Sequence, residues 1–187
     1  MVFHTFGNKE NPVAILIHGM LTPWQIWKNT AEHLSEEFFI IVPELDAHTE
    51  EEPSSFISVE DEANKIKEFV LDNSDGNISL LCGLSMGGRI AATLAGLQGL
   101  TVENLVLDGA PLGSMSKLLI NIMKKNYKDI IDKSKKRNSK ILESAKRDFL
   151  PEKYIPDYLK IADNMDEKSI DNAIQRIRKK AIRNIID

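Results

Sequence analysis

The sequence predicts an α/β protein, with a doubly wound, mostly parallel sheet in residues 1–113 and an all-helical segment in 114–187. This segment is either a lid over the carboxyl edge of the sheet or a small appended bundle. Two observations predict this division. Up to about residue 112, short and nearly continuous apolar runs alternate with amphipathic segments, as expected for strands buried on both faces of a parallel sheet. After Gly113 the chain shows helical periodicity with lysine-rich faces and no convincing strand.

Four apolar runs are the predicted central strands, and residues 2–6 are a predicted edge strand. The runs are PVAILIH, FFIIVP, NISLLCG and ENLVLDG, at residues 12–18, 38–43, 77–83 and 103–109. Amphipathic patterns between them predict helices over 23–34, 59–71 and 86–97. In the second helix Ser58 is the expected N-cap, and Ala63, Ile66 and Val70 share one face. Beyond Gly113, residues 139–150, 151–165 and 166–185 are predicted to form two to four helices.

The composition is that of a globular domain. The chain has 187 residues, of which 42% are hydrophobic and 28% charged. No apolar run approaches the ~20 residues that cross a bilayer, and the first residues lack the pattern of a secretory leader. A single cysteine forms no internal disulfide, so we expect a cytoplasmic location.

Charge is distributed unevenly along the chain. Residues 1–116 carry 5 basic against 17 acidic side chains, and residues 117–187 carry 19 against 11. Attraction between the two parts, with solvated lysines on the helices, accounts for this pattern. A basic surface for polyanions is the alternative, but the stretch KKNYKDIIDKSKKRNSK interleaves acids and lacks the aromatic spacing of a nucleic-acid platform. We therefore expect no nucleic-acid partner.

A serine between glycines lies where a predicted strand meets a predicted helix. Residues 83–87 read GLSMG, the G-x-S-x-G pattern in the strand–turn–helix context that gives it meaning. So tight a turn places the serine at strained backbone angles, and the flanking glycines leave room for neighbouring backbone. Ser85 is therefore the candidate nucleophile. The backbone N–H of Met86, at the start of the helix, is a candidate oxyanion donor.

With His18-Gly19 directly after a buried strand, this motif makes the chain resemble the α/β-hydrolase family. HGM at 18–20 and GLSMGG at 83–88 carry the resemblance. It implies that the Met20 N–H is the second oxyanion donor, that His18 orients the loop without acting as the base, and that no metal or organic cofactor is needed. The expected substrate is a small acyl compound with an apolar body. We expect it to be contacted by Trp24 and Leu84, and by Leu118, Leu119, Ile122 and Met123 of the helical segment. Packing of the core would equally explain Trp24.

For other residues near these motifs we expect a structural role, or a position within reach of the pocket. We expect His48 to be a surface residue of a turn and Cys82 to be a small core residue below the serine. Glu44 and Asp46 lie where they could reach the pocket.

The base that should activate Ser85 is missing from its expected place. In the resembling family the order along the chain is serine, acid, histidine. Four histidines are present, and all precede Ser85: His4, His18, His33 and His48. Asp108, at the end of the last predicted strand, is a candidate acid, although this strand commonly ends in a structural aspartate. The resemblance implies two further strands, bearing the acid and the histidine, after the helical segment.

We therefore expect this 187-residue chain to be a truncated serine hydrolase, acting on a carboxylic ester or related acyl compound through a Ser85 acyl-enzyme and impaired by the missing histidine. A pseudoenzyme that only binds a small ligand, an assembly whose partner completes the sheet, and a basic helical interaction module are the alternatives. Residues 103–109 would form an exposed edge strand, which favours pairing between copies of the chain.

Overall fold

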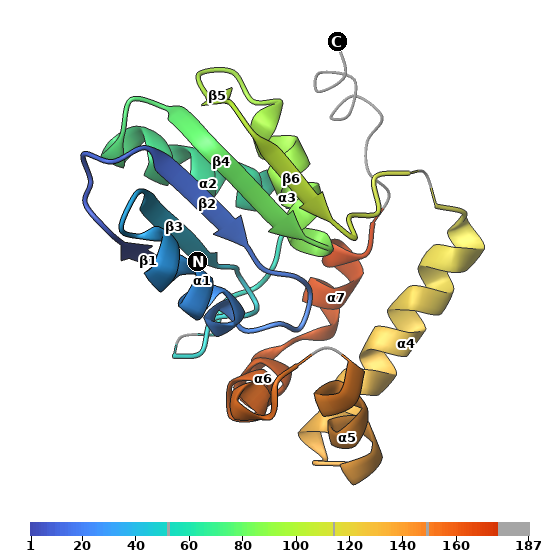
Figure 1. Ribbon diagram of the computed structural model, residues 1–187. Helices are drawn as coiled ribbons and strands as arrows, with labels where there is room; N and C mark the ends of the chain where they lie inside the picture. Colours follow the sequence, from blue (N-terminus) through green and yellow to red (C-terminus); the bar gives the residue numbers. More distant parts are fainter. Residues whose placement is uncertain (52, 114, 149, 176–187) are drawn as a thin grey trace.

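The computed structural model describes residues 1–51, 53–113, 115–148 and 150–175, which form one six-stranded sheet and its flanking helices (Figure 1). The strands are β1 (Val2–Phe6), β2 (Val13–Ile17), β3 (Phe39–Glu44), β4 (Asn77–Leu84), β5 (Thr101–Val102) and β6 (Leu105–Asp108). The α-helices are α1 (Lys28–Leu34), α2 (Val59–Asn73), α3 (Met86–Ala95), α4 (Lys117–Lys135), α5 (Ser139–Asp148), α6 (Ile155–Asn164) and α7 (Glu167–Ala173). Two 3-10 helices are η1 (Trp24–Trp27) and η2 (Glu152–Tyr154).

The predicted α/β class with a mostly parallel sheet is confirmed. The strand order begins β1-β3-β2-β4, and both β5 and β6 pair with β4. β1 runs antiparallel to β3 at the predicted edge, and the other pairings are parallel. The sequence did not predict β5, because two residues are too few for a hydrophobic pattern. The parallel arrangement brings the carboxyl ends of β2, β4 and β6 to one edge of the sheet.

The central strands are buried on both faces, as their apolar runs predict. Every residue of β2 and β3 is buried. Successive side chains of a strand point to opposite faces. Accordingly, Ile15 and Ile17 join an apolar cluster with α2 and α3, and Ala14 and Leu16 join a second cluster with η1 and α1.

Helix starts follow local capping chemistry. Ser58 caps α2, since its Oγ accepts the N–H of Asp61 at 3.0 Å, as predicted. The helix predicted over 23–34 is instead divided into η1 and α1. Its first turn starts at Pro23, which supplies no side-chain cap, and closes through the i→i+3 bond from the Ile26 N–H to the Pro23 carbonyl at 3.2 Å.

The described residues between 117 and 175 are mainly helical and share the core of the sheet. α4 packs against α5, α6 and α7, and the buried Ile131, Tyr158 and Ile161 belong to the same apolar cluster as Ile15. The predicted segment 166–185 begins as α7 with Asp166 as its N-cap, since Asp166 Oδ1 accepts the Ser169 N–H at 2.8 Å. The part of this segment beyond residue 175 lies outside the described residues.

Polar contacts attach the helical segment to the sheet. The Phe56 N–H donates to Ser169 Oγ at 3.0 Å, and Asn172 Nδ2 donates to the Phe56 carbonyl at 2.9 Å. Lys160 Nζ forms an ion pair with Glu50 Oε2 at 2.7 Å, in line with the predicted attraction between the two differently charged parts.

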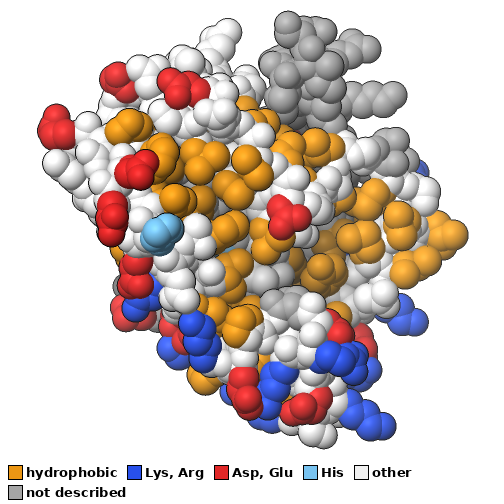
Figure 2. Space-filling view, viewed as in Figure 1, with side chains coloured by type: hydrophobic (Ala, Val, Ile, Leu, Met, Phe, Trp, Pro, Cys, Tyr) orange, Lys and Arg blue, Asp and Glu red, His pale blue; other side chains and the backbone are white. Residues whose placement is uncertain are grey.

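The face of the sheet that carries α1 is open over β4 and β6. Cys82 on β4 is half-buried, and Val106 on β6 is 47% exposed. Figure 2 shows an apolar surface over this face of the sheet. The edge strand predicted at 103–109 is present as β6, and its outward-facing Val106 is available for contact.

Candidate active site

Ser85 occupies a strained turn at the carboxyl edge of the sheet. It lies between the last residue of β4 and the first residue of α3, at φ 53° and ψ −111°. Non-glycine residues rarely adopt a positive φ, and such strain persists only where neighbouring contacts hold it. The Ser85 N–H donates to the Asp108 carbonyl at 2.7 Å, and the Ser85 carbonyl accepts the Gly88 N–H at 3.1 Å. The turn is therefore fixed both to β6 and to α3.

Three glycines allow this turn to form. A Cβ at Gly87 would overlap the carbonyl oxygens of Ile17 and His18, and a Cβ at Gly83 would overlap the backbone of Gly87. A Cβ at Gly88 would lie only 2.5 Å from the Cβ of Ala110. The glycines let α3 start against β2 and β6, and so hold Ser85 at the edge of the sheet.

The loop after β2 lies beside Ser85. The space for a Cβ on Gly19 lies 3.5 Å from the Ser85 Cβ. The Gly19 carbonyl accepts the Thr22 hydroxyl at 2.7 Å and the Thr22 N–H at 3.3 Å, and Leu21 takes a positive φ of 57°. Met20 therefore lies in a tight, internally bonded turn. Met20 and Met86 line the same cavity as Ser85. The first N–H groups of α3, which starts at Met86, have no partner within the helix.

Two buried histidines, His18 and His48, form hydrogen bonds with the backbone of this loop. His18 Nε2 accepts the Leu45 N–H at 3.2 Å, and its other nitrogen bonds the Gly19 carbonyl at 2.9 Å. His48 Nε2 accepts the Leu21 N–H at 3.0 Å, and its other nitrogen bonds the Asp46 carbonyl at 3.1 Å. In each ring the nitrogen facing an N–H must accept and the one facing a carbonyl must donate, which defines a neutral imidazole.

Burial keeps both rings neutral. Loss of solvation lowers the pKa of His18 from 6.5 to about 3, with a further contribution from nearby His48. Loss of solvation likewise lowers the pKa of His48 to about 4. The two rings lie with centroids 5.2 Å apart. They join the loop after β2 to the loop after β3 as hydrogen-bonding elements, and both nitrogens of each ring are engaged.

The expectation that His48 lies on the surface is wrong. Its ring is 1% exposed, because the loop after β3 folds inward against the loop after β2. Nor do Glu44 and Asp46 line the cavities beside Ser85. Glu44 Oε2 bonds His4 Nε2 at 3.0 Å, and Asp46 pairs with the N-terminal ammonium and with Lys65.

Carboxylates gather away from Ser85, next to the start of α2. Oxygens of Asp46, Asp61 and Glu62 lie within 4.8 Å of one another, close enough to hold a cation. Lys65 Nζ already lies 2.5 Å from Asp46 Oδ2 and 2.6 Å from Asp61 Oδ2. Burial, and secondly the charge of Asp46, raises the pKa of Glu62 to about 8, so this carboxyl is protonated at neutral pH. Lys65 and the N-terminal ammonium thus supply the positive charge at this cluster.

Two cavities meet at Ser85. The larger has a volume of about 450 Å³ and is lined by the loop after β2, Leu84 and Ser85 on one side and by the helical segment on the other. The helical side chains are Tyr127 and Ile130 of α4, Pro151, and Tyr154 of η2, and no side chain of this lining is charged. The smaller has a volume of about 30 Å³ and includes Met86, Arg89 and Met123. Ser85, Met20 and Tyr127 line both.

The structure brings only some of the expected binding residues together. Met20, Met86 and Leu84 lie beside Ser85. Trp24 instead stacks on the His4 ring at 3.7 Å between centroids and lines a separate groove with Glu44 and Glu50.

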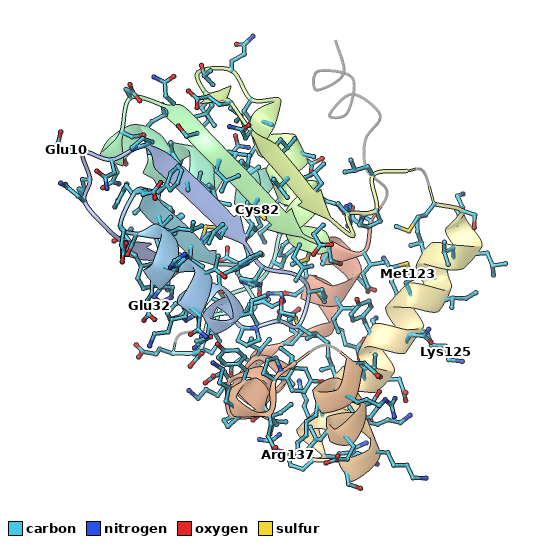
Figure 3. The ribbon with its side chains drawn as sticks, in the orientation of Figure 1. Glu10, Glu32, Cys82, Met123, Lys125 and Arg137 are labelled. Carbon is cyan, nitrogen blue, oxygen red and sulfur yellow. The ribbon has the colours of Figure 1, made fainter. Side chains whose placement is uncertain are left out.

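Leu118 and Ile122 lie on the outer face of α4, 71% and 47% exposed. Figure 3 shows Met123 directed from α4 toward the core and Lys125 on the outer side. The inward face of α4 is formed by residues at helical spacing, Met123, Tyr127 and Ile130. This spacing is visible in the sequence and could have identified Tyr127, but the direction of the helix could not be known from it. Tyr154 and Arg89 were missed as well.

Among the residues that the structure describes, no histidine lies beside Ser85 to act as a general base. All four histidines are among the described residues, and none lines either cavity. His4 bonds Glu44, His33 is exposed on α1, and His18 and His48 are fully engaged. The Asp108 backbone carbonyl accepts the Ser85 N–H, but the exposed Asp108 side chain lines neither cavity. Burial of Cys82 raises the pKa of its thiol, and the negative charge of Asp108 is the second cause.

Comparison with known proteins identifies the fold. A family model described as the alpha/beta hydrolase fold matches residues 12–152, more than half of the chain. The chain therefore belongs to the α/β-hydrolase family. An AB hydrolase superfamily protein from Gibberella zeae is 24% identical over 112 residues, which are 58% of this chain and 39% of that protein. The chain thus spans well under half the length of this curated relative.

Solved structures agree on the fold. A crystal structure from the carboxylesterases of the thaumarchaeon Nitrososphaera gargenis superposes on this chain with a TM-score of 0.74 at 13% identity. The match covers 98% of this chain and 71% of the other. An esterase from a marine microorganism superposes with a TM-score of 0.68 at 21% identity, over 95% and 74% of the two chains. Among the described residues, no helix is both long and apolar enough to span a membrane.

Proposed function

We propose that this chain carries the nucleophile and the acyl-binding cavity of a serine hydrolase that acts on carboxylic esters with an apolar body. The observation that carries the proposal is the position of Ser85, which lies at a strained turn and opens into an uncharged cavity of about 450 Å³. Hydrolase relatives that include esterases support it. We also propose that α4, η2 and their neighbours act as a lid, since Tyr127 and Tyr154 line the cavity opposite the loop after β2 and Ser85.

In the proposed reaction, Ser85 Oγ attacks the ester carbonyl carbon and its proton passes to a base. The carbonyl oxygen becomes anionic and accepts the N–H groups of Met20 and Met86. Loss of one such donor typically lowers kcat by about 100- to 1,000-fold. The alcohol leaves with a proton as the acyl–Ser85 ester forms, and water then cleaves this ester to give the acid and free Ser85. The chemistry of this scheme needs no metal or cofactor.

We infer that residues 1–187 by themselves catalyse this reaction weakly. A serine hydroxyl is a poor nucleophile without an adjacent base, and none of the four histidines lines the cavities. Slow formation of the acyl-enzyme would follow, with binding retained.

A non-catalytic protein that binds a small apolar ligand is the second candidate. The engagement of every nitrogen of His18 and His48 in backbone contacts favours it, because neither ring is free to accept a proton from Ser85. It predicts saturable binding of an apolar acyl compound that Ser85→Ala leaves unchanged, without any covalent adduct.

Labelling with a fluorophosphonate, followed by mass spectrometry, separates the two candidates. The serine-hydrolase proposal predicts a single adduct on Ser85, absent in Ser85→Ala and unchanged in Ser139→Ala, which alters an exposed serine at the start of α5. Hydrolysis of p-nitrophenyl butyrate measured in parallel reports how far the missing base limits turnover. Binding of an apolar acyl compound with no Ser85 adduct would establish the ligand-binding alternative.

A further inference from the structure

Arg89 is a buried cation one helical turn after Ser85. Its side chain is 6% exposed, and it lines the smaller cavity together with Ser85 and Met86. Nη1 donates to the Ala173 carbonyl at 2.8 Å and Nη2 to the Gln175 carbonyl at 2.9 Å. Nε has no hydrogen-bond partner among the described residues, and it is shielded from the cavity by its neighbours. A guanidinium has five N–H donors, so beyond the two backbone bonds each Nη group carries one further N–H.

Among the described residues, no neighbouring carboxylate pairs with the charge of Arg89. Within the described ranges, the ion pairs closer than 4.0 Å do not include this residue. Burial lowers the pKa of Arg89, and the more distant Glu60 offsets this only in part. A buried charge without a partner is unfavourable, and a bound anion would supply the missing partner.

The two cavities beside Ser85 differ in the chemistry that they accept. The larger is uncharged, whereas Arg89 is the charged residue in the lining of the smaller one. The rest of that lining is largely apolar and includes Pro111, Met123 and Ile174. One water occupies roughly 10–15 Å³ on this measure, so a cavity of about 30 Å³ holds a group of about two to three heavy atoms. A carboxylate has this size, and a phosphate is larger.

We propose that Arg89 binds a carboxylate of the substrate in the smaller cavity. The substrate class is then an ester with an apolar body in the larger cavity and a carboxylate on the other side of the scissile carbonyl. The backbone contacts to Ala173 and Gln175 hold the guanidinium in place, so that the second N–H of each Nη group already has a fixed direction before the ligand arrives. This substrate assignment rests on the proposed function, whereas the carboxylate site itself does not require turnover.

Calorimetric binding of two matched probes to the full chain tests the proposal. Octanoate and octanamide have the same length and differ in charge. Hydrogen bonds to a charged group predict about 10- to 100-fold tighter binding of octanoate at pH 7. Arg89→Gln is expected to abolish this preference, and Arg147→Gln, at an exposed arginine paired with Asp148, to retain it. Equal affinities in the unmodified chain, or a preference that survives in folded Arg89→Gln, would overturn the proposal.

A second variant covers the case in which Arg89→Gln does not fold. Met123 lines the smaller cavity but not the larger one, and it is only partly buried on α4. Met123→Trp should fill the smaller cavity, remove the preference for octanoate and leave octanamide binding within about twofold. An undiminished preference would place the carboxylate elsewhere and refute the assignment. A carboxylate preference without fluorophosphonate labelling of Ser85 would refute the serine-hydrolase function alone.

Discussion

Replacement of His48 by glutamine should change how the stability of the protein depends on pH. In the native state His48 is neutral, because Nε2 accepts the Leu21 N–H and burial lowers the pKa to about 4. A glutamine places its carbonyl oxygen near the position of Nε2 and accepts the same N–H without titrating. The variant therefore tests the protonation of one ring while the loop keeps its hydrogen bond.

The magnitude follows from proton linkage. The native pKa lies below the unfolded value of 6.5, so the unfolded state binds the proton more readily, and stability is lost as the pH falls below 6.5. A solution at pH 5 lies about 1.5 pH units below the pKa of the unfolded ring, and each unit corresponds to about 1.4 kcal/mol of stability. His48 should thus remove about 2 kcal/mol between pH 7 and pH 5. The amount depends little on the native pKa once that value is below 5.

The measurement is urea unfolding of the wild type and His48→Gln at pH 7 and pH 5. Glu62 acts in the opposite direction over this range, since its raised native pKa stabilises the protein as the pH falls. Comparing the two chains at each pH cancels this contribution. The stability gap should shift by about 2 kcal/mol in favour of the variant on going to pH 5. His33→Gln, which alters an exposed histidine on α1, is the matched control. Equal pH dependence of wild type and His48→Gln would refute a neutral, buried His48.

Three further changes probe the site and the sheet. Gly87→Ala should cost more than about 3 kcal/mol in chemical unfolding, since its Cβ overlaps two carbonyl oxygens, whereas Gly113→Ala meets no atom within 4 Å and should be nearly neutral. Glu62→Gln should unfold at higher urea than the wild type at pH 9, where the buried carboxyl ionises, with a smaller difference at pH 6. Val106→Lys should reduce the self-association expected at the β6 edge, as sedimentation velocity would show.

Local patterns in the chain were enough to predict the elements that carry the site. The apolar runs mark β2, β3, β4 and β6, because strands buried on both faces leave little room for polar residues. The glycines around Ser85 indicated the strained turn for the same local reason, since their missing Cβ atoms are what the turn requires. Ser58 was identified as an N-cap by the chemistry of helix starts.

The remaining features depend on contacts between distant segments. His48 is buried because the loop after β3 packs against the loop after β2. The hydrogen bond from the Leu21 N–H to His48 Nε2 joins residues 27 apart in the chain, and no local pattern encodes such a contact. Leu118 and Ile122 look like core residues in the sequence, yet α4 directs Met123 and Tyr127 toward Ser85. In the sequence, Arg89 looks like a surface residue of an amphipathic helix. In the structure it is buried, and its guanidinium bonds the carbonyl of Ala173 at the end of α7.

The sequence by itself therefore determined the fold class, the position of Ser85 and the lack of any histidine after it. These follow from residue order and from backbone chemistry within a few residues. Only the tertiary structure decided which side chains enclose Ser85, that both histidines near it are buried and neutral, and that a cation lies in one of its two cavities. Burial and solvation are properties of packed surfaces, and these surfaces arise only when segments far apart in the chain come together.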